Sequence, residues 1–250
     1  MSSSALVAGL WGLLGGSALV LGAFVGYFVR LPQRLIAAIM AFGSGVLISA
    51  LAFELMDEAY KEGGFDSTAI GFLSGAVVYT IANLILAKQG AKHRKRSTSR
   101  QSSEAEDPGS GLAIALGALL DGIPESIVIG VSLISGGVVN WVTVAAVFLS
   151  NIPEGLSSAA GMKKAGRPIQ YVFGIWGAIA LLSALAASFG YLIFSHVSVE
   201  VVAATNAIAA GAILSMIADT MIPEAFEYTH NFAGLITVCG FLAAFILSKL

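Results

Sequence analysis

Long apolar runs constrain the fold of this chain more than any other feature. Read between its polar breaks, the sequence contains eight of them: 5–29, 35–55, 67–87, 111–135, 141–162, 169–194, 199–221 and 232–247. A helix that crosses a bilayer needs about 20 mainly apolar residues. The runs lack the alternation of apolar and polar residues that a membrane β-barrel requires. The sequence therefore predicts an all-α, polytopic membrane protein with eight transmembrane helices, in which residues 1–250 form a single transmembrane domain.

The composition excludes several other classes of protein. Only 11% of the residues are charged and 57% are hydrophobic, whereas an average soluble domain carries about 25% charged residues. These values exclude a disordered chain and a nucleic-acid-binding protein, and the single Cys239 excludes a disulfide scaffold. The first run has no positively charged segment before it and is too long for a signal peptide, so we expect a retained helix.

Basic residues lie almost entirely in alternate connections between the runs. Only Lys61 and Lys249 fall on the other side. The remaining 11 of the 13 occupy the first, third and fifth connections: Arg30, Arg34, Lys88, Lys92, Arg94, Lys95, Arg96, Arg100, Lys163, Lys164 and Arg167. Because short loops rich in Lys and Arg stay in the cytoplasm, we expect odd-numbered connections inside and both termini outside the cell membrane.

The third connection, residues 88–110, is the only long one. It contains a basic block, then several serines, then an acidic patch. Low apolar content and high charge predict a flexible cytoplasmic linker. Two interpretations stay open for it: an anchor and tether, or a regulatory or metal-capturing loop in which His93 is the one histidine.

Three acidic residues lie where lipid-facing helices should exclude them. Asp121 and Glu125 fall in the inner part of the fourth run, and Glu154 in that of the fifth. An acid at the bilayer centre costs about 2.5–3.5 kcal/mol on insertion scales. None of the eight runs contains an interior Lys, Arg or His, so we expect protons or a bound cation to compensate. The alternative is a pair of kinked packing helices with protonated acids.

The spacing of polar residues in these two runs places their oxygens on one face of each helix. Asp121 and Glu125 are four residues apart, and side chains with this spacing share a face. The next run repeats the spacing with Ser150 and Glu154, and adds Asn151. Two adjacent helices therefore carry oxygen ligands at similar depth.

A proline lies within each of these polar groups. Pro124 and Pro153 have no backbone N–H, so the carbonyl oxygens of Leu120 and Leu149 lose their helical donors. Buried carbonyl groups must find another partner. We expect a helix kink at each proline, with the freed oxygens facing water or a cation.

Acids also lie at the ends of the second and seventh runs. Residues 54–60 (Glu-Leu-Met-Asp-Glu-Ala-Tyr) are similar to residues 220–226 (Thr-Met-Ile-Pro-Glu-Ala-Phe), as in transporters built from inverted repeats. Simple polar capping of the span ends is the alternative. The order of the loops places Glu54 and Asp57 at an outer entrance, and Asp219 and Glu224 at an inner exit.

These motifs resemble the ZIP family of divalent metal transporters. The family pattern in the fourth span is His-Asn-x-Pro-Glu-Gly, with a similar His-containing Pro-Glu motif in the fifth. Here the two read Asp121-Gly122-Ile123-Pro124-Glu125-Ser126 and Ser150-Asn151-Ile152-Pro153-Glu154-Gly155. The resemblance covers nearly the whole chain and extends to the ends of the second and seventh runs. It implies a 3+2+3 arrangement of helices, with metal bound between the fourth and fifth spans.

The sequence departs from the family pattern at several positions. Asp121 and Ser150 replace the two histidines, Gly122 replaces an asparagine, and Ala187 stands where some members place an acid for a second metal. The resemblance then implies one metal position, whose expected ligands are Asp121, Glu125 and Glu154, with Asn151 and Ser150 as neutral oxygens. An all-oxygen set favours manganese or ferrous iron over zinc, although zinc also accepts carboxylates.

The function expected from these features is a carrier that moves divalent metal cations into the cytoplasm. Its partners are the metal ion and the lipid bilayer, with no organic cofactor and no nucleic acid, and abundant Gly and Ala permit a homodimer. The main alternative is a ZIP-like protein that has lost transport and acts as a metal sensor or partner subunit. An enzyme is not expected: the sequence has no His-Glu-x-x-His and no phosphate-binding loop, and His196 and His230 lie at opposite span ends.

Overall fold

The computed structural model describes residues 3–136 and 139–249, and in these ranges the chain forms helices and no strand. In chain order they are α1 (Ser3–Phe28), α2 (Gln33–Ala50), η1 (Leu51–Leu55), α3 (Met56–Lys88), η2 (Ala91–His93), α4 (Ser110–Gly136), α5 (Trp141–Lys164), α6 (Ile169–Phe194), α7 (Val199–Met216), η3 (Ile217–Met221), α8 (Ile222–Thr229), η4 (His230–Phe232) and α9 (Ala233–Leu247). The all-α prediction is confirmed.

Five continuous helical stretches in the described part of the chain are long and apolar enough to cross a membrane. They are Ser3–Phe28, Gln33–Lys88, Ser110–Ile134, Ile169–Phe194 and Val199–Leu247. The chain is thus compatible with a transmembrane protein. α5 is not among them, because Asn151, Pro153 and Glu154 make it more polar than its neighbours.

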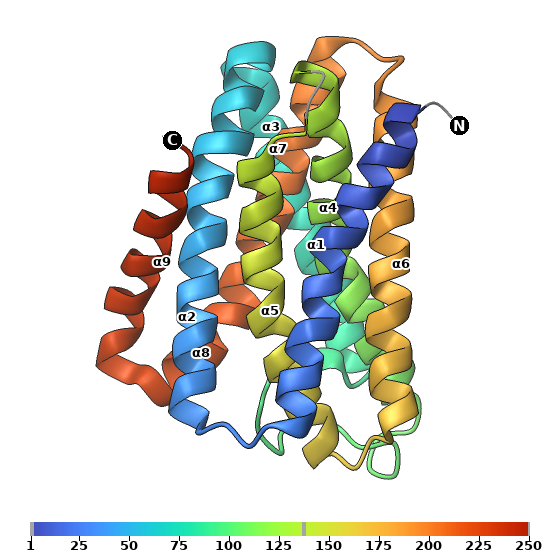
Figure 1. Ribbon diagram of the computed structural model, residues 1–250, viewed down its shortest axis with the longest axis vertical. Coiled ribbons are helices and arrows are strands. Elements are labelled where there is room, and N and C mark those ends of the chain that lie inside the picture. Colours follow the sequence, from blue (N-terminus) through green and yellow to red (C-terminus); the bar gives the residue numbers. More distant parts are fainter. Residues whose placement is uncertain (1–2, 137–138, 250) are drawn as a thin grey trace.

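Two of these stretches contain 56 and 49 residues. At 1.5 Å per residue, a straight helix of the larger size would be about 84 Å long, far longer than a bilayer core of about 30 Å. Gly64 interrupts the first stretch with a φ of 71°, a conformation that glycine adopts without a steric penalty. α2 and the descending part of α3 therefore run antiparallel, and α1 begins at the same end of the bundle at which α9 ends (Figure 1).

The two acidic segments that resemble each other in sequence also share an unusual local structure. η1 and η3 are both π-helical turns, and they occupy equivalent positions in the two similar segments. Glu54 lies in the first turn and Asp219 in the second. A π-turn carries one extra residue per turn and occurs often at functional sites. The two segments are therefore similar in backbone geometry as well as in sequence.

α1 packs directly against the part of α5 that carries the polar motif. α1 also contacts α6, while α3 packs on α7 and α2 on α9. A Cβ atom on Gly155 would collide with the carbonyl oxygen of Leu19, and one on Gly22 would collide with that of Ile152. Small residues allow two helices to approach this closely. The interface fixes the depth and rotation of α5 relative to α1.

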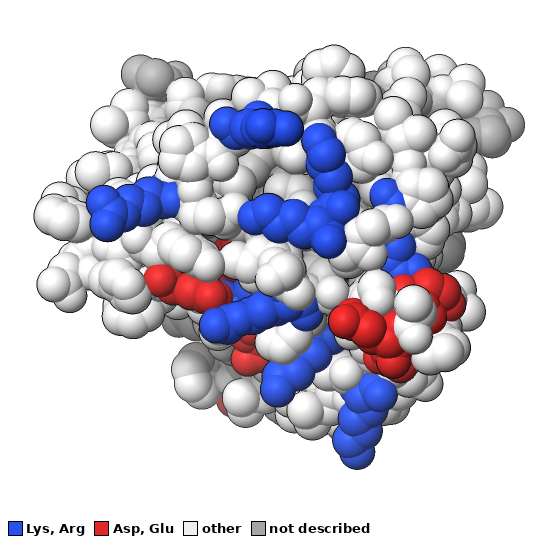
Figure 2. Space-filling model, turned by 90° about the horizontal axis from the view of Figure 1, so that it is seen from below, with Lys and Arg blue, Asp and Glu red and all other residues white. Residues whose placement is uncertain are grey.

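One end of the bundle is rich in charge. Seen from below, this face carries many Lys and Arg side chains together with several acids (Figure 2). It is the end at which the connections α1–α2, α3–α4 and α5–α6 lie (Figure 1). The alternation of basic residues along the sequence is thus reproduced as an asymmetry in space.

Candidate cation site

Two of the three predicted carboxylates meet deep in the bundle. Asp121 on α4 and Glu154 on α5 are only 3% and 4% exposed, and Glu125 on α4 is 1% exposed. The Nζ of Lys95 lies 2.7 Å from Glu154 Oε2 and 3.4 Å from Asp121 Oδ2, so one cation bridges acids from two helices. A single point between α4 and α5 is therefore accessible to both carboxylates.

Arg94 holds the first of these acids on its other side. Its Nε and Nη2 donate to Asp121 Oδ2 and Oδ1 at 2.9 and 2.8 Å, which is a bidentate ion pair. Tyr79 from α3 donates its hydroxyl to Asp121 Oδ1 at 2.7 Å. Arg94 also donates to the Tyr79 hydroxyl and to Asn83 Oδ1, at 2.9 and 2.8 Å. All the groups that donate hydrogen bonds to Asp121 thus come from α3 and from the connection that follows it.

These contacts correct one expectation from the sequence. We expected no basic side chain to reach the buried acids, and protons or an external cation to compensate them. That expectation is wrong, because Arg94 and Lys95 lie outside every apolar run and still enter the bundle from the third connection. Among the residues that the structure describes, no group of three or more His, Cys, Asp or Glu side chains is arranged to hold a metal ion.

Glu125 lies apart from this ion-pair cluster. It lines a separate small cavity whose other walls are mostly apolar, among them Leu51, Val128 and Ile213. Its Oε1 is buried without a hydrogen-bond partner, and the same holds for Oε1 of Glu154. The site therefore retains two buried acceptor oxygens that no described side chain satisfies.

The neutral oxygens predicted as ligands are engaged in packing. Ser150 donates to the carbonyl oxygen of Val147 at 2.9 Å, and Asn151 donates through Nδ2 to that of Gly15 at 3.0 Å. Asn151 still lines a cavity of about 10 Å³ together with Asp121, Glu154 and both basic residues. A volume of this size holds about one water molecule. Of the two, Asn151 has the better access to the acids.

Both prolines lie inside continuous helices. Pro124 falls within α4 and Pro153 within α5, and neither helix ends at its proline. Their side chains still shape the packing, because a Cβ on Gly43 of α2 would meet the ring of Pro153. The kinks predicted at these positions stay a prediction.

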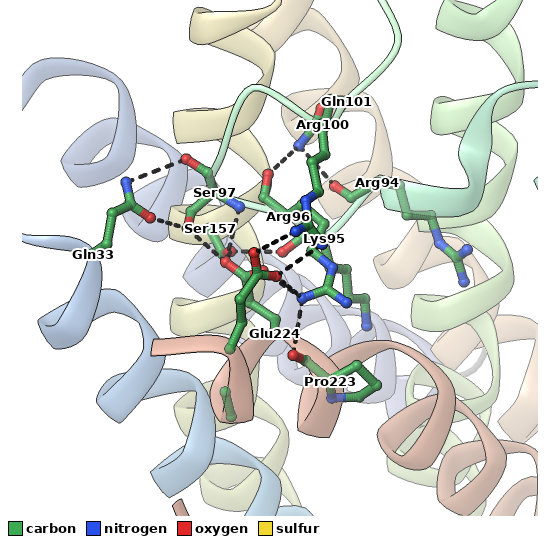
Figure 3. A network of polar contacts seen from close by, with 12 residues as sticks. Gln33, Arg94, Lys95, Arg96, Ser97, Arg100, Gln101, Ser157, Pro223 and Glu224 are labelled. Atoms are coloured by element: carbon green, nitrogen blue, oxygen red, sulfur yellow. Dashed lines mark hydrogen bonds and ion pairs between the residues drawn. The ribbon is translucent and has the colours of Figure 1, made fainter. Parts of the chain in front are cut away.

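Glu224, predicted as an exit acid, is fully buried beneath the third connection. Its Oε1 accepts from the backbone N and the Oγ of Ser97, at 2.9 and 2.5 Å, and from Ser157 Oγ at 3.0 Å. Arg96 lies 3.3 Å from the other carboxylate oxygen. Ser157 also donates to the carbonyl oxygen of Lys95 at 2.6 Å. Figure 3 shows these groups converging on Glu224 of α8 from α5 and from the connection.

Gln101 fixes the backbone of the connection to α5. Its Nε2 donates to the carbonyl oxygens of Arg94, Arg96 and Ser158 at 3.0, 2.8 and 2.9 Å (Figure 3). The sequence predicted a flexible linker here. In the structure, residues 94–101 instead make specific contacts with the bundle, because their polar groups find partners on distant helices.

The other predicted pathway residues lie at the two ends of the bundle. Glu54 accepts a hydrogen bond from Asn140 Nδ2 at 2.6 Å, and Asp57 pairs with the exposed Lys61 at 2.6 Å. At the opposite end, Asp219 is exposed and lines a cavity of about 300 Å³ that Lys95 also lines. The structure thus places Asp219, predicted as an exit acid, on the same cavity as a basic residue of the buried cluster.

Sequence reasoning missed Arg94, Lys95, Tyr79 and Asn83 as members of the site. Tyr79 and Asn83 are polar residues four apart in a mainly apolar run, which places them on one helix face. That spacing was the available signal. The two basic residues carried none of their own, since charged residues in a loop are ordinarily satisfied by water.

A further ion pair holds the later part of the connection, and its pH dependence can be predicted. Arg167 Nη1 lies 2.6 Å from Glu104 Oε2, and Glu104 also accepts from the backbone of Gly109 and Gly111. The hydrogen bond from Arg167, followed by those from the backbone, lowers the pKa of Glu104 from 4.5 to about 2. A carboxylate with a lowered pKa stabilises the folded state fully above its ordinary pKa, and this contribution is lost as pH falls through the lowered value.

We therefore expect the loop around Glu104 to stay ordered down to pH 4.5 and to loosen as the pH approaches 2. Hydrogen–deuterium exchange of peptides covering residues 102–111, corrected for the intrinsic pH dependence of exchange, measures this. Glu104→Gln should exchange faster than the parent at every pH above 4.5. Equal protection in the parent and in Glu104→Gln would contradict the prediction.

No family model matches this chain, and none of the curated proteins compared with it matches either.

Proposed function

We propose that the protein is a divalent metal cation transporter that carries metal into the cytoplasm between α4 and α5. The observation that supports it is the meeting of Asp121 and Glu154, from two helices, around one side-chain cation in an apolar bundle. Buried acids in membrane helices mark ion pathways by default. The proposal includes the resemblance to the ZIP family, eight membrane crossings and the 3+2+3 arrangement.

The chemistry of the site supports hard or borderline cations. Asp121 and Glu154 supply carboxylate oxygens, Glu125 a further acid from the same helix face, and Asn151 an amide oxygen. Oxygen ligands suit manganese and ferrous iron, and zinc also accepts carboxylates. We propose these three metals as substrates, with manganese and iron preferred.

The proposed route runs from Glu54 and Asp57 at one end to Asp219 and Glu224 at the other. The concentration of Lys and Arg on the end that contains the exit acids supports a cytoplasmic location for that end, and extracytoplasmic termini (Figure 2). The cavity of about 300 Å³ beside Asp219 and Lys95 supports exit there. Weak binding along such a route lets an ion leave as well as enter.

One observation favours a second candidate function. Arg94 and Lys95 neutralise the two central acids, so a cation from outside is not needed to compensate their charge. A ZIP-like protein that has lost transport, and acts as a metal sensor or partner subunit, would have this arrangement permanently.

Metal uptake into proteoliposomes tests the proposed transport. We expect the parent to accumulate Mn²⁺ or Fe²⁺ faster than Zn²⁺, and Glu154→Gln to lower uptake about tenfold or more, because a pathway acid is lost. Glu106→Gln removes one charge from an exposed loop carboxylate and serves as the matched control. Undiminished uptake in Glu154→Gln would reject the site, and absence of uptake for every metal would favour the sensor or partner subunit.

A further inference from the structure

The proposed transport leaves the entry of the third connection into the bundle unexplained. We propose that residues 94–97, here named the plug, act as a tethered competitor of the transported cation. Arg94 and Lys95 occupy the central carboxylates from the exit end, and the plug withdraws before a divalent cation binds there or leaves. This inference rests on the proposed function in one respect, because it takes the competing cation to be the transported metal.

The charges of the plug match those of its competitor. Arg94 and Lys95 together carry two positive charges, as does one divalent cation. Both acids that they contact are almost fully buried, and a buried carboxylate without a partner is strongly destabilising. An exchange of the two side chains for one divalent ion leaves the total charge of the site unchanged. Either occupant satisfies the acids, and Lys95 leaves no room for both at the shared point.

The two contacts of the plug differ in quality. Arg94 makes an oriented bidentate pair with Asp121. Lys95 is a single point charge shared by two acids, 2.7 Å from Glu154 Oε2 and 3.4 Å from Asp121 Oδ2, and Glu154 Oε1 has no hydrogen-bond partner. The contact of Lys95 with the acids is therefore less directional than the bidentate pair of Arg94. Because Glu154 Oε1 stays unpartnered, a metal ion gains more by replacing Lys95 at this point than by replacing Arg94.

A latch at the exit end holds the plug in place without making it part of a helix. Ser97 donates two hydrogen bonds to Glu224, and Gln101 joins the plug backbone to Ser158 of α5. The plug lies between η2 and α4, outside both. Withdrawal breaks these side-chain contacts and unfolds no helix. The cavity beside Lys95 and Asp219 provides space toward which the lysine can retreat.

Direct metal binding tests the competition. The double substitution Arg94→Gln/Lys95→Gln removes the competitor, and Arg30→Gln/Lys88→Gln removes the same charge from exposed positions at the same end of the bundle. Where the plug leaves only a tenth of the sites open, its removal tightens apparent affinity about tenfold. We expect Mn²⁺ to bind the detergent-solubilised plug variant at least about tenfold more tightly than the control. Equal Mn²⁺ affinity in the two variants overturns the proposal.

A cross-link tests the withdrawal without removing any charge, so it also applies where the first variant fails to fold. Ser97 and Ser157 both contact Glu224 Oε1, and Ser97→Cys/Ser157→Cys in a Cys239→Ser background places two thiols there. We expect disulfide formation to abolish Mn²⁺ uptake and reduction to restore it. Uptake that is equal in the oxidised and reduced proteins overturns the plug. If Arg94→Gln/Lys95→Gln binds Mn²⁺ more tightly but no variant takes up metal, the plug is supported and the proposed transport is rejected.

Discussion

Replacing Gly155 with alanine will separate α1 from α5 and destabilise the folded protein. The new Cβ atom would collide with the carbonyl oxygen of Leu19, and the reciprocal contact of Gly22 with Ile152 leaves no free direction for a small shift. Overpacking a core costs about 1–3 kcal/mol, and more where the obstacle cannot move. Here the obstacle is helix backbone, so we expect a loss at or above the upper end of that range. The fraction of detergent-solubilised protein that stays monodisperse on heating measures it.

Gly177→Ala provides the matched control. Gly177 lies in the middle of α6, and a Cβ atom there would meet nothing within 4 Å. Alanine is more favourable than glycine in a helix by about 1 kcal/mol, so this substitution should leave the melting temperature unchanged or raise it. A similar response to the same substitution at both positions would show that α1 and α5 are not in close backbone contact. The site depends on this contact, since Glu154 directly precedes Gly155 on α5.

The helices were predictable because their signal is local. Runs 5–29 and 169–194 coincide closely with α1 and α6, since an apolar segment of this length has few alternatives to a helix. The reversals were predictable as connections between runs, but not as exact positions. Gly63 and Gly64 both lie in the second connection, and the sequence alone does not mark which of the two has the positive φ. That choice depends on the packing of α3 against α7, which involves residues far apart in the chain.

The candidate site was predictable in its acids and not in their partners. Asp121 and Glu154 stand out because acids are rare in apolar runs. Lys95 lies in a segment whose composition is typical of a solvated linker, and its buried position is decided by contacts to α4 and α5 that no local pattern encodes. A charge count over the whole chain was the missing step, because buried acids require cations and the only long loop is strongly basic.

The ion pair between Arg94 and Asp121 will show strong coupling in a double-mutant cycle. Asp121→Asn leaves the Arg94 guanidinium buried without its carboxylate, and breaking a buried pair in this way costs about 3–5 kcal/mol. Arg94→Gln leaves Asp121 with Lys95 and Tyr79 only. The double variant removes both charges, so we expect its loss of unfolding free energy to be clearly smaller than the sum of the two single losses. Equilibrium unfolding in mixed detergent micelles measures all three.

The exposed pair of Asp57 and Lys61 is the matched control for this cycle. Its side chains are 48% and 69% exposed, and exposed pairs four residues apart on a helix contribute about 0.3–0.5 kcal/mol. Asp57→Asn/Lys61→Gln should therefore be nearly additive. Additivity at Arg94 and Asp121 as well would mean that the third connection does not dock on α4 in solution. Strong coupling between Arg94 and Asp121, with none at the surface pair, would mean that a loop with the composition of a linker supplies the counter-charges of the bundle interior. The stability of α4 and the occupancy of the site would then depend on the same two side chains.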